Sequence, residues 1–426
     1  MEITLKKVLL SVLILYGLLF VSFLNDYNGV FLFHADAHEY VALAKNIVEH
    51  KVFSRDLVVP EIIRTPGYPL LIAVTMAVAG DQFSYLVVLI QILMVGCTAY
   101  TIYRMAIILF DNPRLGTLVA IVYVLMPTTI YYAVTGMTET FFTFLLALTL
   151  YLLASKEISY RKAFLAGAII SLAILVRPIA ILSPIFILPM AMRNQWRNGI
   201  YFLAGLILIL APWVIRNYQQ GYGVTVSYIG AFNLAHGNAA KFYQWQNNVD
   251  APVALKAIEK EVDTVTRDNS SLNTTQAHKK VALQHILSNI PAYAWFHVVK
   301  TTPFFLASSI KGIALNLHLT NSGERTADLL LKGKSAGIIL KLIKEFPFTM
   351  ESILRIALTI LMCIGLWQAW KNKNVFLVLL FLLIIQFGLL MSPWAEVRFR
   401  VPLEPYVLLL AFSVFIKKMS LNSSDL

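Results

Sequence analysis

The sequence predicts an all-α polytopic membrane protein with about ten transmembrane helices. Of its 426 residues, 58% are hydrophobic and only 14% are charged, and the mean hydropathy is +0.70. A soluble domain of this size does not need so much apolar surface, so lipid is the solvent for most of the chain. The apolar residues also fall into separate runs with basic residues between them, as in proteins that cross a bilayer repeatedly.

The placement of the basic residues and the cysteine content argue against a nucleic-acid-binding protein, a disulfide-rich protein and a cysteine metal site. The net charge of +12 would suggest nucleic acid as the partner of a soluble protein. Here the basic residues lie mostly between apolar runs, where they set topology, so membrane lipids are the expected partner and nucleic acid is not. Cys97 and Cys363 both lie inside apolar runs, which supports neither a disulfide framework nor a metal cluster.

Ten apolar runs approach the roughly 20 residues that a membrane span needs. They are 7–24, 83–110, 115–132, 139–154, 163–176, 178–192, 199–215, 352–370, 375–391 and 403–418. With the basic loops on one side, both termini are expected in the cytoplasm of a multi-pass plasma-membrane protein. Pro178 would break a continuous helix over 163–192, so we expect two short spans that bring Arg177 to the exoplasmic surface.

This topology divides the chain into three parts. Residues 1–216 form an N-terminal membrane module that includes a first exoplasmic loop, 25–82. Residues 217–351 are exoplasmic or interfacial, and 352–426 supply the C-terminal transmembrane helices.

The first loop is expected to contain two interfacial helices. Apolar residues recur at helical spacing on one face of 37–50, with polar residues opposite, which predicts an amphipathic helix at the interface. The apolar face holds Tyr40, Leu43, Ala44, Ile47 and Val48. Residues 70–79 are apolar but too short to span, so a second interfacial or re-entrant helix is expected there. The aromatic-rich segment 291–306 is also expected at the interface.

Asp36 lies near the start of the polar stretch 34–69. With Glu39 three residues later it fits the capping-box pattern of a helix N-terminus, so a structural role is one interpretation. The other is a general base, because partial desolvation at the membrane edge would raise the pKa of the carboxyl group and make it more basic. Both roles are compatible, since an N-cap also fixes where the carboxylate points.

The neighbours of Asp36 raise the question of a metal site. His34, Asp36 and His38 alternate, and with Glu39 they are side chains of the kind that bind a divalent ion. Alternating polar residues at a loop-to-helix junction are nevertheless commoner than metal sites. No cofactor is expected with certainty, and a divalent cation at His34, His38 and Glu39 stays an alternative.

Six arginines lie on the side where basic residues are usually scarce: Arg55, Arg64, Arg177, Arg216, Arg398 and Arg400. Some of them are expected to anchor at the headgroup level, Arg55 above all. Arg177 and Arg400 each adjoin an apolar span and a proline, so each needs a carboxylate or a lipid phosphate as its partner. A guanidinium that binds phosphate would also stabilise charge developing on a leaving group.

Glu139 stands at the expected exoplasmic start of the span 139–154. One interpretation is a helix-dipole contact, with Thr138 as a cap. The other is a second carboxylate that faces the same site as Asp36.

These residues resemble motifs of the polytopic GT-C glycosyltransferases, in the branch of the protein mannosyltransferases and the lipid A aminoarabinose transferases. The order and spacing of the motifs match over roughly the first half of the chain and again near its end. The motifs are Asp36 with Tyr40 and Ala44, RTPGYPLLIA at 64–73, TET at 138–140, LVRP at 175–178, APWVIRNY at 211–218 and VRFRVPLEPY at 397–406.

The resemblance implies transfer of a sugar from a polyprenyl-phosphate carrier on the exoplasmic face, usually with inversion. Asp36 occupies the place of the family's catalytic acid, and Glu139 that of a second loop acid. Substrate-binding roles are implied for Tyr40, Arg64, Tyr68, Arg177, Arg216, Arg398 and Arg400. Some family members carry two successive acids, whereas Asp36 is followed by Ala37 and His38. The region 225–350 has no motif that aligns, so the acceptor, whether protein, lipid or glycan, stays open.

Two alternative functions remain at this stage. A transporter or flippase for an anionic or lipid-linked substrate would also use arginines at the membrane edge, but transporters usually show repeated halves and polar residues at mid-span. A polymerase or ligase that acts on whole lipid-linked glycans is a closer alternative.

Overall fold

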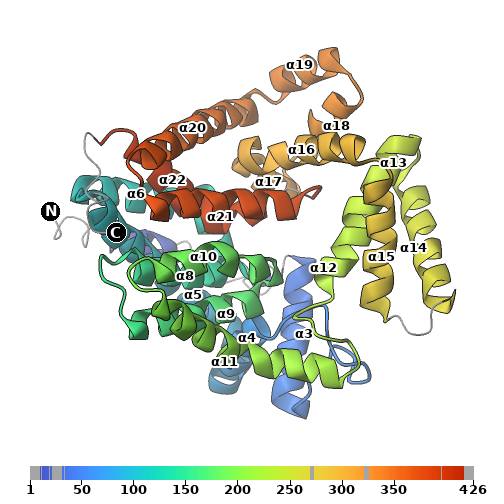
Figure 1. The fold of residues 1–426 in the computed structure, drawn as a ribbon, viewed down its shortest axis with the longest axis horizontal. Helices are drawn as coiled ribbons and strands as arrows, with labels where there is room; N and C mark the ends of the chain where they lie inside the picture. The colour runs from blue at the N-terminus through green and yellow to red at the C-terminus, as the bar shows by residue number, and fades with distance from the viewer. Residues whose placement is uncertain are drawn as a thin grey trace.

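The computed structural model describes residues 10, 12–18, 20–21, 31–32, 34–268, 273–320, 326–394 and 396–416. The described part of the chain is all helical and contains no strand. Figure 1 shows α4, α5 and α8 to α11 below the C-terminal helices α20 to α22, with α6 beside α22 and α12 to α15 to one side. The predicted first span, 7–24, and the end of the last one lie partly outside the described residues.

Several predicted helices have the observed bounds. α5 (Phe83–Phe110), α8 (Glu139–Ala154) and α21 (Val375–Met391) coincide with predicted spans, and α11 (Arg197–Gln219) and α20 (Phe346–Lys371) contain theirs. The span predicted at 115–132 is divided into α6 (Pro113–Leu125) and α7 (Pro127–Val134), which meet at an angle of 55°. Pro127 explains this break, because it begins α7 and cannot continue the hydrogen bonding of α6.

The predicted break at Arg177 is confirmed. α9 (Tyr160–Val176) ends there, and the short 3-10 helix η3 (Pro178–Leu182) leads into α10 (Pro184–Met192). The second helix of the first loop, α4 (Gly67–Ala79), continues through η2 (Gly80–Gln82) into α5. Gly67–Phe110 therefore forms one apolar helical segment of 44 residues. Its backbone changes conformation at Gly80, whose φ is +54°.

The apolar helices make this an integral membrane protein. Among the described residues, three helical segments are long and apolar enough to cross a bilayer, or four if the bent pair α6–α7 counts as one span. In the most apolar stretches of α11 and α20, only 28% and 17% of residues are buried by protein. Their exposed leucines and isoleucines thus face lipid. The number of ten spans stays a prediction.

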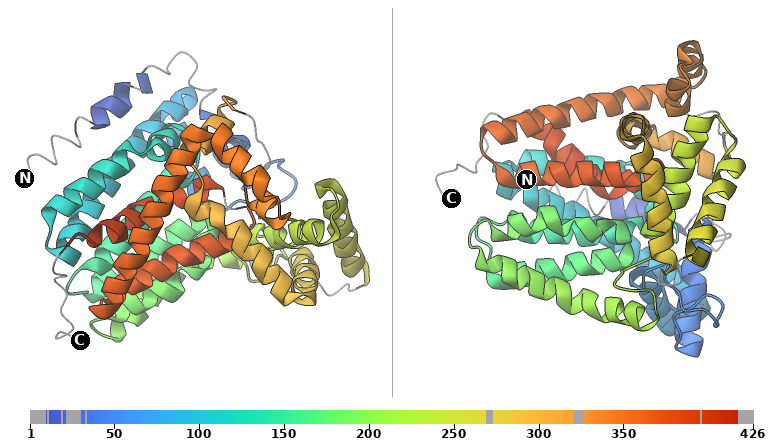
Figure 2. Two further views of the ribbon diagram at one scale, coloured as in Figure 1. Left: turned by 90° about the horizontal axis from the view of Figure 1, so that it is seen from above. Right: turned by 45° about the vertical axis from the view of Figure 1, so that its right-hand side comes forward.

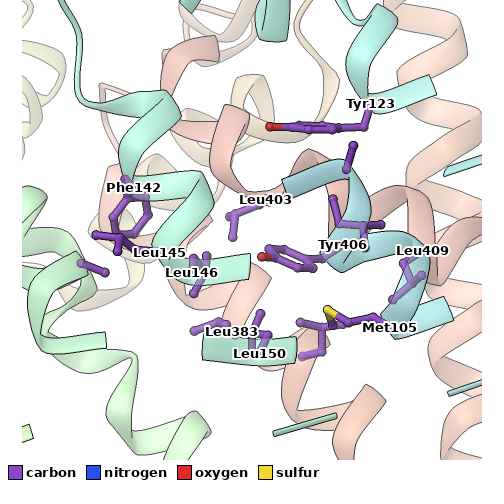
Figure 3. Packing of buried hydrophobic residues seen from close by; sticks show 14 of the residues in the cluster. Met105, Tyr123, Phe142, Leu145, Leu146, Leu150, Leu383, Leu403, Tyr406 and Leu409 are labelled. Atoms are coloured by element: carbon purple, nitrogen blue, oxygen red, sulfur yellow. The ribbon is translucent and has the colours of Figure 1, made fainter. Parts of the chain in front are cut away.

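Small residues bring two of the helices close together. A Cβ at Gly167 of α9 would meet the backbone carbonyl of Phe202, and one at Gly205 of α11 would meet that of Phe164. Each glycine thus admits the backbone of the other helix, as is common where helices associate in a membrane. Elsewhere the core is large and apolar, and Figure 3 shows Tyr406 of α22 (Glu404–Ser413) among leucines from α8 and α21.

The region after α11 forms a separate helical layer. α12 (Ile229–Phe232), the π-helical turn η4 (Asn233–Ala239) and α13 (Ala240–Asn247) lead into the pair α14 (Ala251–Asp268) and α15 (Thr274–Ser288). These elements enclose a small apolar core of their own and project from the bundle (Figure 2). The chain returns through α16 (Ile290–Leu306), α17 (Ser309–Asn316), α18 (Thr326–Leu331) and α19 (Ser335–Lys344) to α20.

Candidate active site

Asp36 lies on α3 (Ala35–His50), the amphipathic helix predicted in the first loop. Its predicted apolar face is confirmed, because Tyr40, Leu43 and Ala44 are buried. The predicted N-cap role of Asp36 is wrong. The N-cap residue is His34, no side chain caps the helix, and Asp36 falls in the first turn. Its carboxylate forms ion pairs with two arginines instead of capping the helix.

Two arginines bind the Asp36 carboxylate, one at each oxygen. Nη2 of Arg64 lies 2.7 Å from Oδ1, and Nη1 of Arg398 lies 2.8 Å from Oδ2. The side chains of Asp36, Arg64 and Arg398 are 23%, 19% and 26% exposed, respectively, so solvent or a ligand can still reach them. Arg398 comes from η5 (Val397–Leu403), which follows α21 and packs against α8.

The ion pairs continue from Asp36 into the rest of the first loop. Nε of Arg64 lies 2.8 Å from Glu39, and Nη1 of Arg55 lies 3.1 Å from the same Glu39 oxygen. Arg55 in turn contacts Glu61 at 2.5 Å. Acidic and basic side chains therefore alternate in a continuous series of ion pairs from Glu61 to Asp36. Arg55, predicted to be a headgroup anchor, is part of this series.

The expected rise in the pKa of Asp36 is wrong in sign. Burial raises the pKa of its carboxyl group, but the charges and hydrogen bonds of Arg398 and Arg64 outweigh burial and hold it below its usual value. Burial lowers the pKa of the Arg64 guanidinium, but Tyr40, Glu39 and Asp36 together outweigh burial and raise it. The resting carboxylate is thus ionised and only weakly basic.

The second predicted acid, Glu139, lies close to this cluster. It is 1% exposed at the start of α8, and Oε1 lies 2.6 Å from Nη1 of Arg177. Thr138 is the N-cap residue of α8, but its side chain makes no capping hydrogen bond. The charges of Glu139 and Asp36 both act on His34, where burial is the largest influence and lowers the pKa. Each carboxylate is held by arginine, and the charges of both reach the same histidine.

The two tyrosines predicted to bind substrate are buried. Tyr40 packs edge to face against Tyr68, with ring centroids 5.2 Å apart, and the Arg64 guanidinium lies 5.3 Å from the Tyr40 ring. The Tyr68 hydroxyl donates to Oε1 of Gln91, and Nε2 of Gln91 donates to two backbone carbonyls near the end of α7. In these positions the rings support Arg64 and fasten α4 to α5.

Two of the predicted arginines point away from Asp36. Arg216, near the end of α11, donates to the Glu61 carbonyl at 2.7 Å and stacks on Trp213. Arg400 is 2% exposed and bonds to Glu404 at 2.8 Å, to the carbonyls of Phe304 and Ala307, and to Ser309. It belongs to a buried cluster with Arg355, whose Nη1 lies 2.6 Å from Glu404.

Two of the three residues considered for a metal are engaged in other contacts. His34 contacts the Tyr131 hydroxyl at 2.9 Å and stacks on Tyr132, and Glu39 is held by two arginines. His38 is exposed. Within the described ranges, no group of three or more His, Cys, Asp or Glu side chains has the geometry of a metal site.

Sequence reasoning missed the organising roles of Glu61 and Glu404. Glu61 is 4% exposed and Glu404 is 1% exposed, and each pairs with arginine. Glu61 lies three residues before RTPGYP and Glu404 lies inside VRFRVPLEPY, so an acidic residue in or near an arginine-bearing motif was the available signal.

An all-helical membrane fold with arginine-held acids at the starts of α3 and α8 agrees with the class predicted from the motifs. Residues 63–215 match the family model described as dolichyl-phosphate-mannose-protein mannosyltransferase. This segment contains Arg64, Glu139 and Arg177, whereas Asp36 and Arg398 lie outside it. No curated protein matches the chain significantly.

Solved structures match the fold over nearly the whole chain. The archaeal oligosaccharyltransferase AglB from Archaeoglobus fulgidus, in complex with an inhibitory peptide and a dolichol-phosphate, has 15% identity and a TM-score of 0.51, with 96% of this chain and 50% of that chain covered. The A. fulgidus oligosaccharyltransferase in complex with Zn and sulfate has 13% identity and a TM-score of 0.51, with 95% and 49% covered. The chain thus spans about half the length of these proteins. The resemblance to the GT-C glycosyltransferases is confirmed.

Proposed function

We propose that this protein is a membrane glycosyltransferase that moves a sugar from a polyprenyl-phosphate carrier to an acceptor hydroxyl, with inversion, on the exoplasmic face. The observation that carries the proposal is the Asp36 carboxylate, partly exposed and held between Arg64 and Arg398. Support comes from the family match of 63–215 and from the fold shared with an oligosaccharyltransferase solved with dolichol-phosphate.

In this proposal the donor phosphate competes with Asp36 for the guanidinium groups. Arginine forms bidentate hydrogen bonds with phosphate as well as with carboxylate, so the binding groups are already in place. When Arg64 and Arg398 turn to the phosphate, burial is left as the dominant influence on Asp36 and raises its pKa. Donor binding therefore converts a weakly basic carboxylate into a competent general base.

The chemical step then follows from proton and charge balance. The acceptor oxygen forms a bond to the anomeric carbon while its proton passes to Asp36, and the bond from that carbon to the phosphate oxygen breaks. The departing polyprenyl phosphate takes the electron pair, and the arginines stabilise the charge that develops on it. Glu139, paired with Arg177, supplies the second acidic group of the site.

No step of this proposal uses a metal ion. One matching oligosaccharyltransferase structure contains Zn, but here arginines hold the carboxylates of Asp36 and Glu39. A chelator titration in the transfer assay tests the alternative directly. Loss of activity that a divalent ion restores would establish a metal requirement.

The test compares Asp36→Asn and Asp36→Ala in membranes that contain labelled polyprenyl-phosphate mannose or polyprenyl-phosphate aminoarabinose. Release of polyprenyl phosphate is measured, so the acceptor need not be known. General-base catalysis typically contributes about 10²- to 10⁴-fold, and both variants should lose activity on that scale. Asp111→Asn is the control, because Asp111 is exposed at the end of α5. Near-wild-type turnover by folded Asp36→Asn contradicts the base assignment.

A ligase of whole lipid-linked glycans is the second candidate, favoured by the fold match to an oligosaccharyltransferase. Donors with one sugar and with several sugars distinguish the two functions in the same assay. Turnover of the oligosaccharide donor alone would identify a ligase. Movement of intact donor across vesicles without release of polyprenyl phosphate would identify a flippase.

A further inference from the structure

Both carboxylate oxygens of the loop residue Glu61 have partners in the structure. Its Oε1 accepts hydrogen bonds from the backbone N–H groups of three successive residues, Ile62 at 3.0 Å, Ile63 at 2.6 Å and Arg64 at 3.1 Å. Its Oε2 pairs with Arg55, and the side chain is only 2% exposed. Three converging N–H groups form an anion-binding concavity, and here the chain fills it with its own carboxylate.

The carbonyl side of the same turn is fixed by the segment that follows α11. Tyr228 donates its backbone N–H to the Ile62 carbonyl at 3.0 Å, and the Ser227 hydroxyl donates to the Ile63 carbonyl at 2.6 Å. The Glu61 backbone is also bonded on both sides, to the Phe53 carbonyl and to Arg216. The turn that ends at Arg64 is therefore specified by Glu61 within the loop and by Ser227 and Tyr228 outside it.

Building on the proposed function, we propose that Glu61 is a positioning residue that sets the turn from which Arg64 reaches Asp36. The position of Arg398 does not depend on Glu61, because the Arg400–Glu404 pair fixes η5, which carries Arg398. Loss of Glu61 should therefore displace one of the two arginines and leave the other in place. The charged or titratable groups around Asp36 are Arg64, Arg398, Glu39, His34, Tyr40, Glu139, Arg177 and Glu396.

The test measures the titration of Asp36 rather than turnover alone. Infrared difference spectra of the full-length protein are recorded against pH, and the Asp36→Asn spectrum identifies the Asp36 band. Because an adjacent cation lowers a carboxyl pKa by about 1–3 units, Glu61→Ala should move the Asp36 titration upward by about one unit. Glu61→Gln retains an oxygen that accepts the N–H groups and loses the charge facing Arg55, so its shift should be smaller.

Asp56→Ala is the matched control. Asp56 lies in the same loop, and its carboxylate also accepts two backbone N–H groups, those of Val58 and Val59, but its turn carries no arginine that contacts Asp36. Asp36 should titrate as in the wild type in this variant. If Glu61→Ala leaves the Asp36 titration unchanged, or if Asp56→Ala shifts it equally, the positioning role is wrong.

Turnover separates this inference from the proposed function. If the enzyme transfers sugar, the acid limb of kcat/KM in Glu61→Ala should move to higher pH with the Asp36 band. A wild-type protein that does not transfer sugar would refute the proposed function, yet the infrared shift would still decide the role of Glu61. If Glu61→Ala does not fold, Glu61→Met decides, because it fills similar space but offers no oxygen to the three N–H groups. A titration of Asp36 identical to the wild type in Glu61→Met again contradicts the inference.

Discussion

Arg398 places its guanidinium 2.8 Å from the carboxylate of Asp36, although 362 residues separate the two in the sequence. This contact joins the C-terminal helices to the first loop at the proposed catalytic group. The pair keeps the carboxylate ionised at rest, and its exchange for a lipid phosphate is the central event of the proposed mechanism.

Removing Arg398 should weaken the enzyme most at low pH. Arg398 is the largest of the influences that lower the pKa of Asp36, so Arg398→Met should raise that pKa and move the acid limb of kcat/KM to higher pH. Arg398→Lys keeps the charge but loses the planar fork, so its shift should be intermediate. The measurement is kcat/KM against pH, with exposed Arg161→Met as control. An unmoved acid limb in Arg398→Met would show that this pair does not control the base.

Glu139 and Arg177 should depend on each other for stability. Glu139 is 1% and the Arg177 side chain 11% exposed, and removal of one partner from a buried pair costs about 3–5 kcal/mol. Glu139→Gln and Arg177→Met should each lower the thermal unfolding temperature in detergent, and the double variant should recover part of the loss. If the double variant also recovers turnover, Glu139 has no chemical role of its own.

Arg400 is expected to act on stability rather than on donor affinity. Its guanidinium is surrounded by Glu404, Ser309 and two carbonyls. Arg400→Met should therefore reduce the amount of folded protein, while the fraction that folds keeps a wild-type KM for the donor. A large rise in KM with normal stability would instead support the phosphate-binding role implied by the family resemblance.

The close contact of α9 and α11 should tolerate no side chain at Gly167. An added Cβ would overlap the Phe202 carbonyl, and overpacking of this kind costs about 1–3 kcal/mol. Gly167→Ala should lower the unfolding temperature, whereas Gly230→Ala should not, because nothing lies within 4 Å of a Cβ at Gly230. Equal stability of the two variants would mean that the helices separate at little cost.

The sequence by itself determined those features that depend on local periodicity and on backbone chemistry. The helices α5, α8 and α21, the buried face of α3 and the break at Arg177 could all be predicted, because helical spacing and proline act over a few residues. The sequence also indicated most of the arginines and acids of the site.

Only the tertiary structure decided which of these charges meet. Arg398 and Arg400 are two positions apart on η5, yet one binds Asp36 and the other binds Glu404. That choice lowers the pKa of Asp36 where burial alone would raise it. Electrostatic effects depend on distances between segments remote in sequence, and those distances are set by the packing of α8, α21 and η5 rather than by any local pattern.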